Sequence, residues 1–153
     1  MKKIKIVKLT TDILIIGGGA AGCYAGVKIK EQSQDTEVLI AEKAHIKRSG
    51  CLGAGISALN AYLTPGVTPK DYVEYVKQDA EGLVREDLLY TIAEGLNQAA
   101  ATLEEWGVPF VKDDKGNYVF KGKRGIKIKG EHIKPTMAEA VRKRRIEVLN
   151  RVN

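Results

Sequence analysis

The chain has 153 residues, of which 44% are hydrophobic and 29% are charged, and its formal net charge is +6. This composition is typical of a globular chain with one core, and the length is short for an enzyme that binds both a dinucleotide and a substrate. The longest uncharged run, residues 13–27, contains 15 residues and five glycines. It is too short for a membrane-spanning helix, which needs about 18 apolar residues, so we expect no direct membrane insertion.

The basic residues are spread along the chain and become denser only in its last third. Because no aromatic residues alternate with them in a nucleic-acid motif, we expect a solvated basic face and no nucleic-acid partner. The two cysteines, Cys23 and Cys51, fit neither a disulfide framework nor the spacing of a metal site. This favours a reducing compartment, so we expect a cytoplasmic location and no bound metal.

The first part of the chain is predicted to form a strand, a helix and a second strand. Residues 12–16 and 37–41 are short, branched apolar runs, which are typical of buried parallel strands. The stretch between them, residues 20–30, has apolar side chains at helical spacing. It predicts a helix whose apolar face carries Ala21, Tyr24, Ala25 and Ile29.

A G-x-G-x-x-G pattern, formed by Gly17, Gly19 and Gly22, lies where the first strand meets the helix. In a nucleotide-binding βαβ unit the first glycine allows a sharp turn, the second lets the backbone approach a pyrophosphate, and the third lets helix and strand pack closely. The first helical turn, which opens with Ala20 and Ala21, offers its amide groups to the phosphates. We therefore expect all five residues to bind a dinucleotide.

Glu42 ends the second predicted strand, 20 residues beyond Gly22. A carboxylate at this place accepts hydrogen bonds from ribose hydroxyls and repels the 2′-phosphate of NADP, which leaves NAD and FAD. A second loop of small and glycine residues follows directly and extends to Asn60. Such a loop is unusual in NAD-binding folds, so it favours FAD.

Two helices are predicted in the middle of the chain. Thr68 is a helix cap, Pro69 stands at the first helical position, and Asp71 completes a partial capping box, which predicts a helix to about Gly82. The second helix is predicted over residues 85–106, and its apolar face carries Leu88, Leu89, Ile92, Leu96, Ala99, Leu103 and Trp106. We interpret Trp106 as a core residue rather than a group that stacks on a flavin.

The last third is predicted to hold short strands, a helix and a final strand. Residues 108–112 and 117–129 predict two or three short strands around a turn at 113–117, and residues 135–145 predict a helix. Residues 146–150 predict a third parallel strand. The lysines at 121–129 could steer an anionic substrate, but alternating isoleucines favour a half-exposed strand. We interpret His132 as structural rather than as a proton carrier.

Motifs along nearly the whole chain carry a family resemblance. They occupy residues 11–22, 42–43, 48–50, 56–60, 71–73, 82–88, 105–109 and 130–135. Together they resemble the flavoproteins of the fumarate reductase and succinate dehydrogenase superfamily, and most closely the adenylylsulfate reductase alpha subunits. The resemblance implies an α/β fold with a Rossmann-like FAD-binding βαβ unit, added helices and a small β-hairpin.

The resemblance also implies a division of the chain, all of it the N-terminal portion of an FAD-binding domain. Residues 1–60 correspond to the βαβ unit and second FAD loop, residues 61–133 to a helical and hairpin segment, and residues 134–153 to a return helix and strand. Members of the family continue for several hundred residues beyond the matching strand. We therefore expect an incomplete domain, a fragment that is inactive alone.

Further site residues follow from the resemblance. It implies that Lys43, Ser49 and Gly50 line the same dinucleotide as the glycine motif and Glu42, and that Asn60 lies beside the flavin ring. The alternative for Asn60 is an asparagine that caps or ends a short helix before the turn at 64–66. No catalytic residue is identified beyond this placement of Asn60.

Two positions depart from the family pattern. Membrane-bound fumarate reductases and succinate dehydrogenases attach FAD covalently through a histidine in the second loop, where this sequence has Arg48. His45 lies three residues earlier, does not align, and is interpreted as an exposed loop histidine, so the resemblance implies noncovalent FAD. Lys121 replaces an acidic residue of the adenylylsulfate reductases, which leaves the substrate open.

The resemblance implies a two-electron oxidoreductase that acts between FAD and a small anionic molecule, with an iron-sulfur ferredoxin-like partner subunit. Fumarate reductase and L-aspartate oxidase flavoproteins are the enzyme alternatives. A nucleotide-binding module without redox chemistry and a basic interaction protein are the non-enzymatic alternatives. Neither of these two accounts for residues 42–60.

Overall fold

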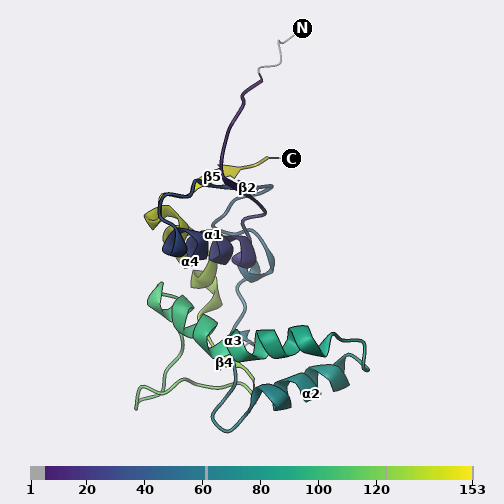
Figure 1. The fold of residues 1–153 in the computed structure, drawn as a ribbon. Coiled ribbons are helices and arrows are strands. Elements are labelled where there is room, and N and C mark those ends of the chain that lie inside the picture. The colour runs from purple at the N-terminus through teal and green to yellow at the C-terminus, as the bar shows by residue number, and fades with distance from the viewer. Residues whose placement is uncertain (1–5, 61, 123, 153) are drawn as a thin grey trace.

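The computed structural model describes residues 6–60, 62–122 and 124–152. A small sheet and two helices lie at one end, and a helical hairpin lies at the other (Figure 1). The elements in chain order are β1 (Ile13–Ile16), α1 (Ala20–Gln32), β2 (Val38–Glu42), the 3-10 helix η1 (Cys51–Ala54), β3 (Ala58–Leu59), α2 (Pro69–Asp79), α3 (Glu86–Glu105), β4 (Ile126–Lys127), the 3-10 helix η2 (Gly130–His132), α4 (Ile133–Lys143) and β5 (Glu147–Asn150).

Strands β1, β2 and β5 form a parallel sheet in that order, with Ile15 paired to Ile40 and Ile40 to Val148. The predicted third parallel strand is confirmed. The prediction that β1 is buried is wrong, because Leu14 is 54% exposed and Ile16 is 78% exposed. Both α1 and α4 lie on one side of the sheet (Figure 1), and β1 is an edge strand, so its outward residues remain open within the described chain.

The predicted apolar face of helix α1 is confirmed only in part, since Tyr24 and Ile29 are half-buried and pack against the core. Ala21 and Ala25 are exposed, whereas Cys23, Gly26 and Val27 are buried. Gly26 faces the sheet, since a Cβ atom there would lie in van der Waals contact, at 3.4 Å, with side chains of β1, β2 and the residue before β5. Cys23 and Val27 bury more apolar surface than Ala21 and Ala25 could, so packing on the sheet through the face that carries them is more favourable.

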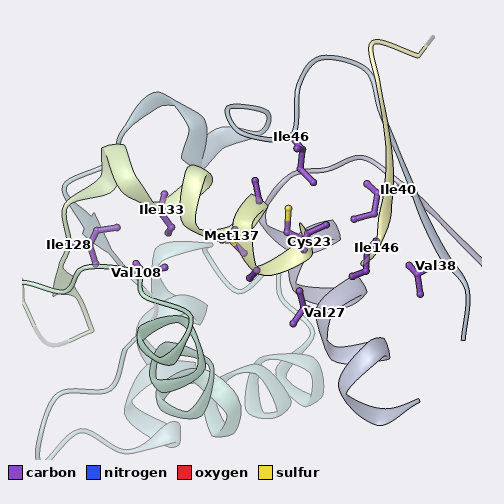
Figure 2. Packing of buried hydrophobic residues seen from close by; sticks show 13 residues of the cluster. Cys23, Val27, Val38, Ile40, Ile46, Val108, Ile128, Ile133, Met137 and Ile146 are labelled. Carbon is purple, nitrogen blue, oxygen red and sulfur yellow. The ribbon is translucent and has the colours of Figure 1, made fainter. Parts of the chain in front are cut away.

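Helix α4 connects two parts of one core. Ile133 packs near Val108 and Ile128, while the next turn brings Met137 toward Cys23 in α1 (Figure 2). The helix begins two residues before its predicted start, so Pro135 is its third residue. That position tolerates proline because the first four amides of a helix have no intrahelical acceptor.

Helices α2 and α3 run side by side as a hairpin (Figure 1). The predicted capping box is confirmed: the Thr68 hydroxyl accepts from the amide of Asp71 at 3.3 Å, and the Asp71 carboxylate accepts from the amide of Thr68 at 2.7 Å. Trp106 packs against the core and lies 5.2 Å from the Tyr24 ring between centroids, as predicted. The predicted apolar face of α3 is only partly buried, because Leu88 and Ile92 are exposed.

The predicted strands around residues 113–117 are mostly single bridges, such as Lys112 with Tyr118. The turn itself forms, since the Asp113 carboxylate accepts from the amides of Lys115 and Asn117. The regular pairing is instead between β4 and β3, at the end of the second loop. In this segment Ile126 and Ile128 are buried and Lys127 is exposed, which confirms a half-exposed strand. No helix in the described part of the chain is long and apolar enough to cross a membrane.

Candidate functional site

The loop between β1 and α1 presents the open N-terminus of a helix. Gly17 has φ +98°, in the left-handed region that favours glycine, and its amide donates to the carbonyl of Ala41 at 2.8 Å. Gly19 is the N-cap of α1, and no side chain caps the helix there. The amides of the first turn, which begins with Ala20 and the exposed Ala21, therefore remain available to an anion, and the helix dipole favours negative charge at this end.

Gly22 allows α1 to lie directly against the loop that precedes it. A Cβ atom at this position would lie 2.0 Å from the carbonyl oxygen of Gly17 and 3.2 Å from the side chain of Ile15. The first distance is far below any contact between these atoms. The third glycine of the motif thus has the close-packing role that such a motif gives it.

Glu42, at the end of β2, is 5% exposed and fixes the same loop through its carboxylate. One oxygen accepts from the amide of Ala44 and the other from the amide of Gly18, both at 2.6 Å. The Ala44 amide in particular holds the pKa of Glu42 below its ordinary value, against the effect of burial, with help from the Gly18 amide, Ser49 and Lys134. The ionised carboxylate is an acceptor only, and each oxygen keeps a further lone pair for a hydroxyl donor.

The second loop lies against the first. The Ser49 hydroxyl is buried and donates to the carbonyl of Gly18 at 2.9 Å. Gly50 has φ +78°, and a Cβ atom there would lie 3.1 Å from the Cα of Gly19. At the other end of this stretch, the amide of Ile46 donates to the Asn150 side chain at 2.8 Å, which ties the loop to β5. Ser49 and Gly50 are therefore brought together with the glycine motif.

A cavity of about 380 Å³ opens at the carboxyl ends of β1 and β2. It is lined by Ile16, Gly17, Ala41, Glu42, Lys43 and Val152. Ligands of parallel α/β sheets bind outside the carboxyl ends of the strands, next to the Gly-rich turn. The predicted residues Gly17, Glu42 and Lys43 thus share one cavity at the expected place.

Asn60 lies elsewhere, at the exit of β3, where it lines a separate cavity of about 1200 Å³ beside α2. Lys121 and Arg124 line this second cavity as well. The alternative that Asn60 caps or ends a short helix is wrong, because the preceding element is a strand. Its predicted position beside a flavin ring stays a prediction.

Three further residues of the sequence analysis are exposed or lie near the surface. Arg48 is exposed in the second loop. His45 is half-buried rather than exposed, and its Nδ1 accepts from the amide of Lys47 at 3.2 Å. His132 has a side chain that is 60% exposed and lies 3.7 Å from the Glu131 carboxylate, so it makes no contribution to the core.

Lys134 was not predicted as a site residue. Its side chain is 1% exposed, and its Nζ donates to the carbonyl of Gly18 at 2.6 Å and to the sulfur of Cys23 at 3.3 Å. The only signal in the sequence is a lysine at helical spacing from Met137, Ala138 and Val141, on the apolar face of its helix.

These features fit the ADP half of a dinucleotide. The loop excludes a side chain at Gly22, the N-terminus of α1 is uncapped, and an acceptor-only carboxylate borders the cavity. A family profile described as an FAD binding domain matches residues 12–151. The chain belongs to this family of FAD-binding domains. The cofactor of this flavoprotein family is FAD, as the second loop predicted.

Relatives place the domain among flavoprotein oxidoreductases. The adenylylsulfate reductase subunit alpha of Megalodesulfovibrio gigas is 32% identical over 161 residues, which cover 90% of this chain and 24% of the relative. The L-aspartate oxidase of Pseudomonas aeruginosa is 29% identical and matches 70% of this chain and 19% of its own length. This FAD-binding domain thus spans about a quarter or less of the curated relatives it matches.

Solved structures agree with this placement. The adenylylsulfate reductase of Archaeoglobus fulgidus superposes with a TM-score of 0.81 at 38% identity, over 92% of this chain and 24% of that one. The E. coli quinol fumarate reductase superposes with a TM-score of 0.77 at 18% identity, over 92% and 26%, and shows the shared fold alone. The resemblance to the superfamily, and to the adenylylsulfate reductase alpha subunits within it, is confirmed.

Proposed function

We propose that this chain holds the ADP half of FAD within a two-electron oxidoreductase of the adenylylsulfate reductase alpha type. The observation that carries the proposal is the Glu42 carboxylate, held between the amides of Gly18 and Ala44 at the edge of the strand-end cavity. This arrangement suits the ribose hydroxyls, and the open N-terminus of α1 suits the diphosphate. The bound flavin would supply the two-electron chemistry.

Each residue of the site has a definite task in this proposal. Glu42 binds and orients the adenosine ribose through the lone pairs that its two backbone donors leave free. The amides of Ala20 and Ala21 bind the diphosphate, and Lys43 borders the same cavity with a positive charge. Ser49 and Gly50 hold the second loop against the first.

The substrate and the partner are also part of the proposal. Similarity to adenylylsulfate reductase alpha subunits supports a small anionic substrate and an iron-sulfur partner subunit. A cytoplasmic location is supported by the two free cysteines, of which Cys23 is buried and Cys51 is exposed. The L-aspartate oxidase and fumarate reductase relatives support the two enzyme alternatives, which a substrate assay can separate.

We expect FAD to be bound noncovalently, because an exposed arginine, Arg48, occupies the loop position at which the covalent branches of the superfamily carry the linking histidine. The protein purified with added FAD should show a flavin absorbance spectrum. After denaturation and gel filtration, the flavin should elute apart from the polypeptide. Flavin that remains with the denatured polypeptide would contradict noncovalent binding, and a colourless protein that binds only ADP would favour a nucleotide-binding module.

We expect the 153-residue chain alone to show no turnover, because it spans about a quarter of its adenylylsulfate reductase relative. The assay would offer adenylylsulfate, sulfite, fumarate and L-aspartate in turn, each with a dye that donates or accepts electrons. Each assay compares the flavin-loaded chain with a flavin-free sample, which is the control. Flavin-dependent turnover of any one compound would overturn this expectation and would identify the substrate class directly.

A further inference from the structure

Lys134 is a buried cation directly behind the glycine motif. It stands in the first turn of α4, 116 residues from Gly18 in sequence, yet its Nζ lies 2.6 Å from the Gly18 carbonyl oxygen. Its other hydrogen-bond partner is the sulfur of Cys23, at 3.3 Å, and burial raises the pKa of that thiol, so the sulfur is neutral. No carboxylate forms an ion pair with Lys134 within the residues that the structure describes.

The contact of Lys134 completes the anchoring of one residue, Gly18, in the cofactor loop. The carbonyl of Gly18 accepts from Lys134, from the Ser49 hydroxyl at 2.9 Å and from the Cys23 thiol at 3.3 Å. Its amide donates to Glu42 at 2.6 Å. Both the amide and the carbonyl of Gly18 are thus bound by groups of the protein itself. The phosphates are left to the amides of neighbouring residues, and the anchored Gly18 fixes the orientation of those amides.

The charge of Lys134 also needs a partner. Burial of a cation is unfavourable unless negative charge or several hydrogen bonds compensate it. Glu42 supplies part of this compensation through space, and Lys134 in turn helps to keep its carboxylate ionised. A diphosphate at the open N-terminus of α1 would bring negative charge to the opposite side of the same loop.

We propose that Lys134 is a positioning residue for the diphosphate of FAD: it holds the Gly18 peptide and adds positive potential behind the loop that receives the phosphates. The proposal rests on FAD binding by this domain and goes beyond it, since it assigns a role to a residue with no place in the glycine motif. Lys134 acts through the loop and not by touching the reacting flavin. A charge-assisted hydrogen bond of this kind is about twice as strong as a neutral one.

Three variants separate charge from packing. Lys134→Gln keeps a donor but removes the charge, Lys134→Met removes both, and Lys134→Arg keeps the charge. Met137→Leu, one turn further on the same buried face of α4, is the matched control for packing. Dissociation constants for FAD, ADP and adenosine are measured for each protein, together with the thermal stability of the ligand-free form.

Lys134→Gln and Lys134→Met should weaken FAD and ADP about tenfold, which corresponds to about 1.4 kcal/mol, and should change adenosine by less than twofold. Lys134→Arg should recover most of the affinity, and Met137→Leu should leave all three ligands unchanged. Affinities of Lys134→Gln equal to wild type would overturn the proposal. Equal losses for ADP and adenosine would also overturn it, because a merely structural role does not depend on the phosphates.

Two further outcomes, a variant that does not fold and a wild-type protein that binds no nucleotide, can be told apart from those above. If Lys134→Met does not fold, the comparison of Lys134→Gln with Lys134→Arg still decides whether the charge matters. If the wild-type protein binds neither FAD nor ADP, the nucleotide site as a whole is overturned, and the role of Lys134 with it. A wild-type protein that binds both, beside a Lys134→Gln variant of the same affinity, removes the role of Lys134 alone.

Discussion

Gly22→Ala should abolish measurable FAD binding and destabilise the fold by about 3 kcal/mol, at the upper end of the range for overpacked sites. The new methyl group would lie 2.0 Å from the carbonyl oxygen of Gly17, which is backbone and has no rotamer by which to move away. Relief of this contact requires α1 to shift off the loop, and the amides of its first turn move with it. Urea unfolding and a flavin-binding titration measure the two effects.

Gly95→Ala is the matched control for this substitution. Gly95 lies within α3, and a Cβ atom there would meet nothing within 4 Å. Alanine is a better helix former than glycine by about 0.5–1 kcal/mol, so this variant should be slightly more stable and should bind FAD normally. A Gly22→Ala protein with the stability and affinity of Gly95→Ala would show that α1 does not need its close approach to the loop.

Local chemistry explains which parts of the fold could be predicted from the sequence. The turn geometry of the glycine motif and the capping box of Thr68 and Asp71 depend on residues close together in the chain, and both form as expected; Glu42 ends the second strand as predicted. The burial of β1 could not be predicted, because it depends on what covers an edge strand. The inward face of α1 likewise depends on contacts of Gly26 with side chains that come from three separate strands and loops.

The candidate site shows the same division. Gly17 and Glu42 follow from strand ends and glycine spacing, and Lys43 follows from the family resemblance; the three line one cavity. Lys134 reaches the loop only because α4 crosses the core, so its contact with Gly18 spans 116 residues and leaves no local pattern. The pairing of β3 with β4 was missed for a similar reason: it joins residues 58–59 to 126–127, and two-residue strands carry almost no periodicity.

Glu42→Gln should weaken FAD binding at least tenfold and destabilise the ligand-free protein by about 1–3 kcal/mol. Both carboxylate oxygens accept from backbone amides, so the amide group of glutamine would direct its own N–H toward either Gly18 or Ala44. One buried donor then loses its acceptor, and the ribose loses part of an acceptor-only partner. Glu94→Gln, an exposed position on α3, is the control and should leave both affinity and stability unchanged.

The same carboxylate should give the protein a characteristic dependence on acid. Because the Ala44 amide and the other donors hold the folded pKa of Glu42 below its ordinary value of 4.5, the unfolded chain binds this proton more readily than the folded one. The stabilisation is therefore complete above about pH 4.5 and is lost as the pH falls through the folded pKa. The difference in unfolding free energy between wild type and Glu42→Gln should therefore shrink as the pH falls through that window. A difference that stays constant at every pH below the window would show that Glu42 stabilises the loop without its charge.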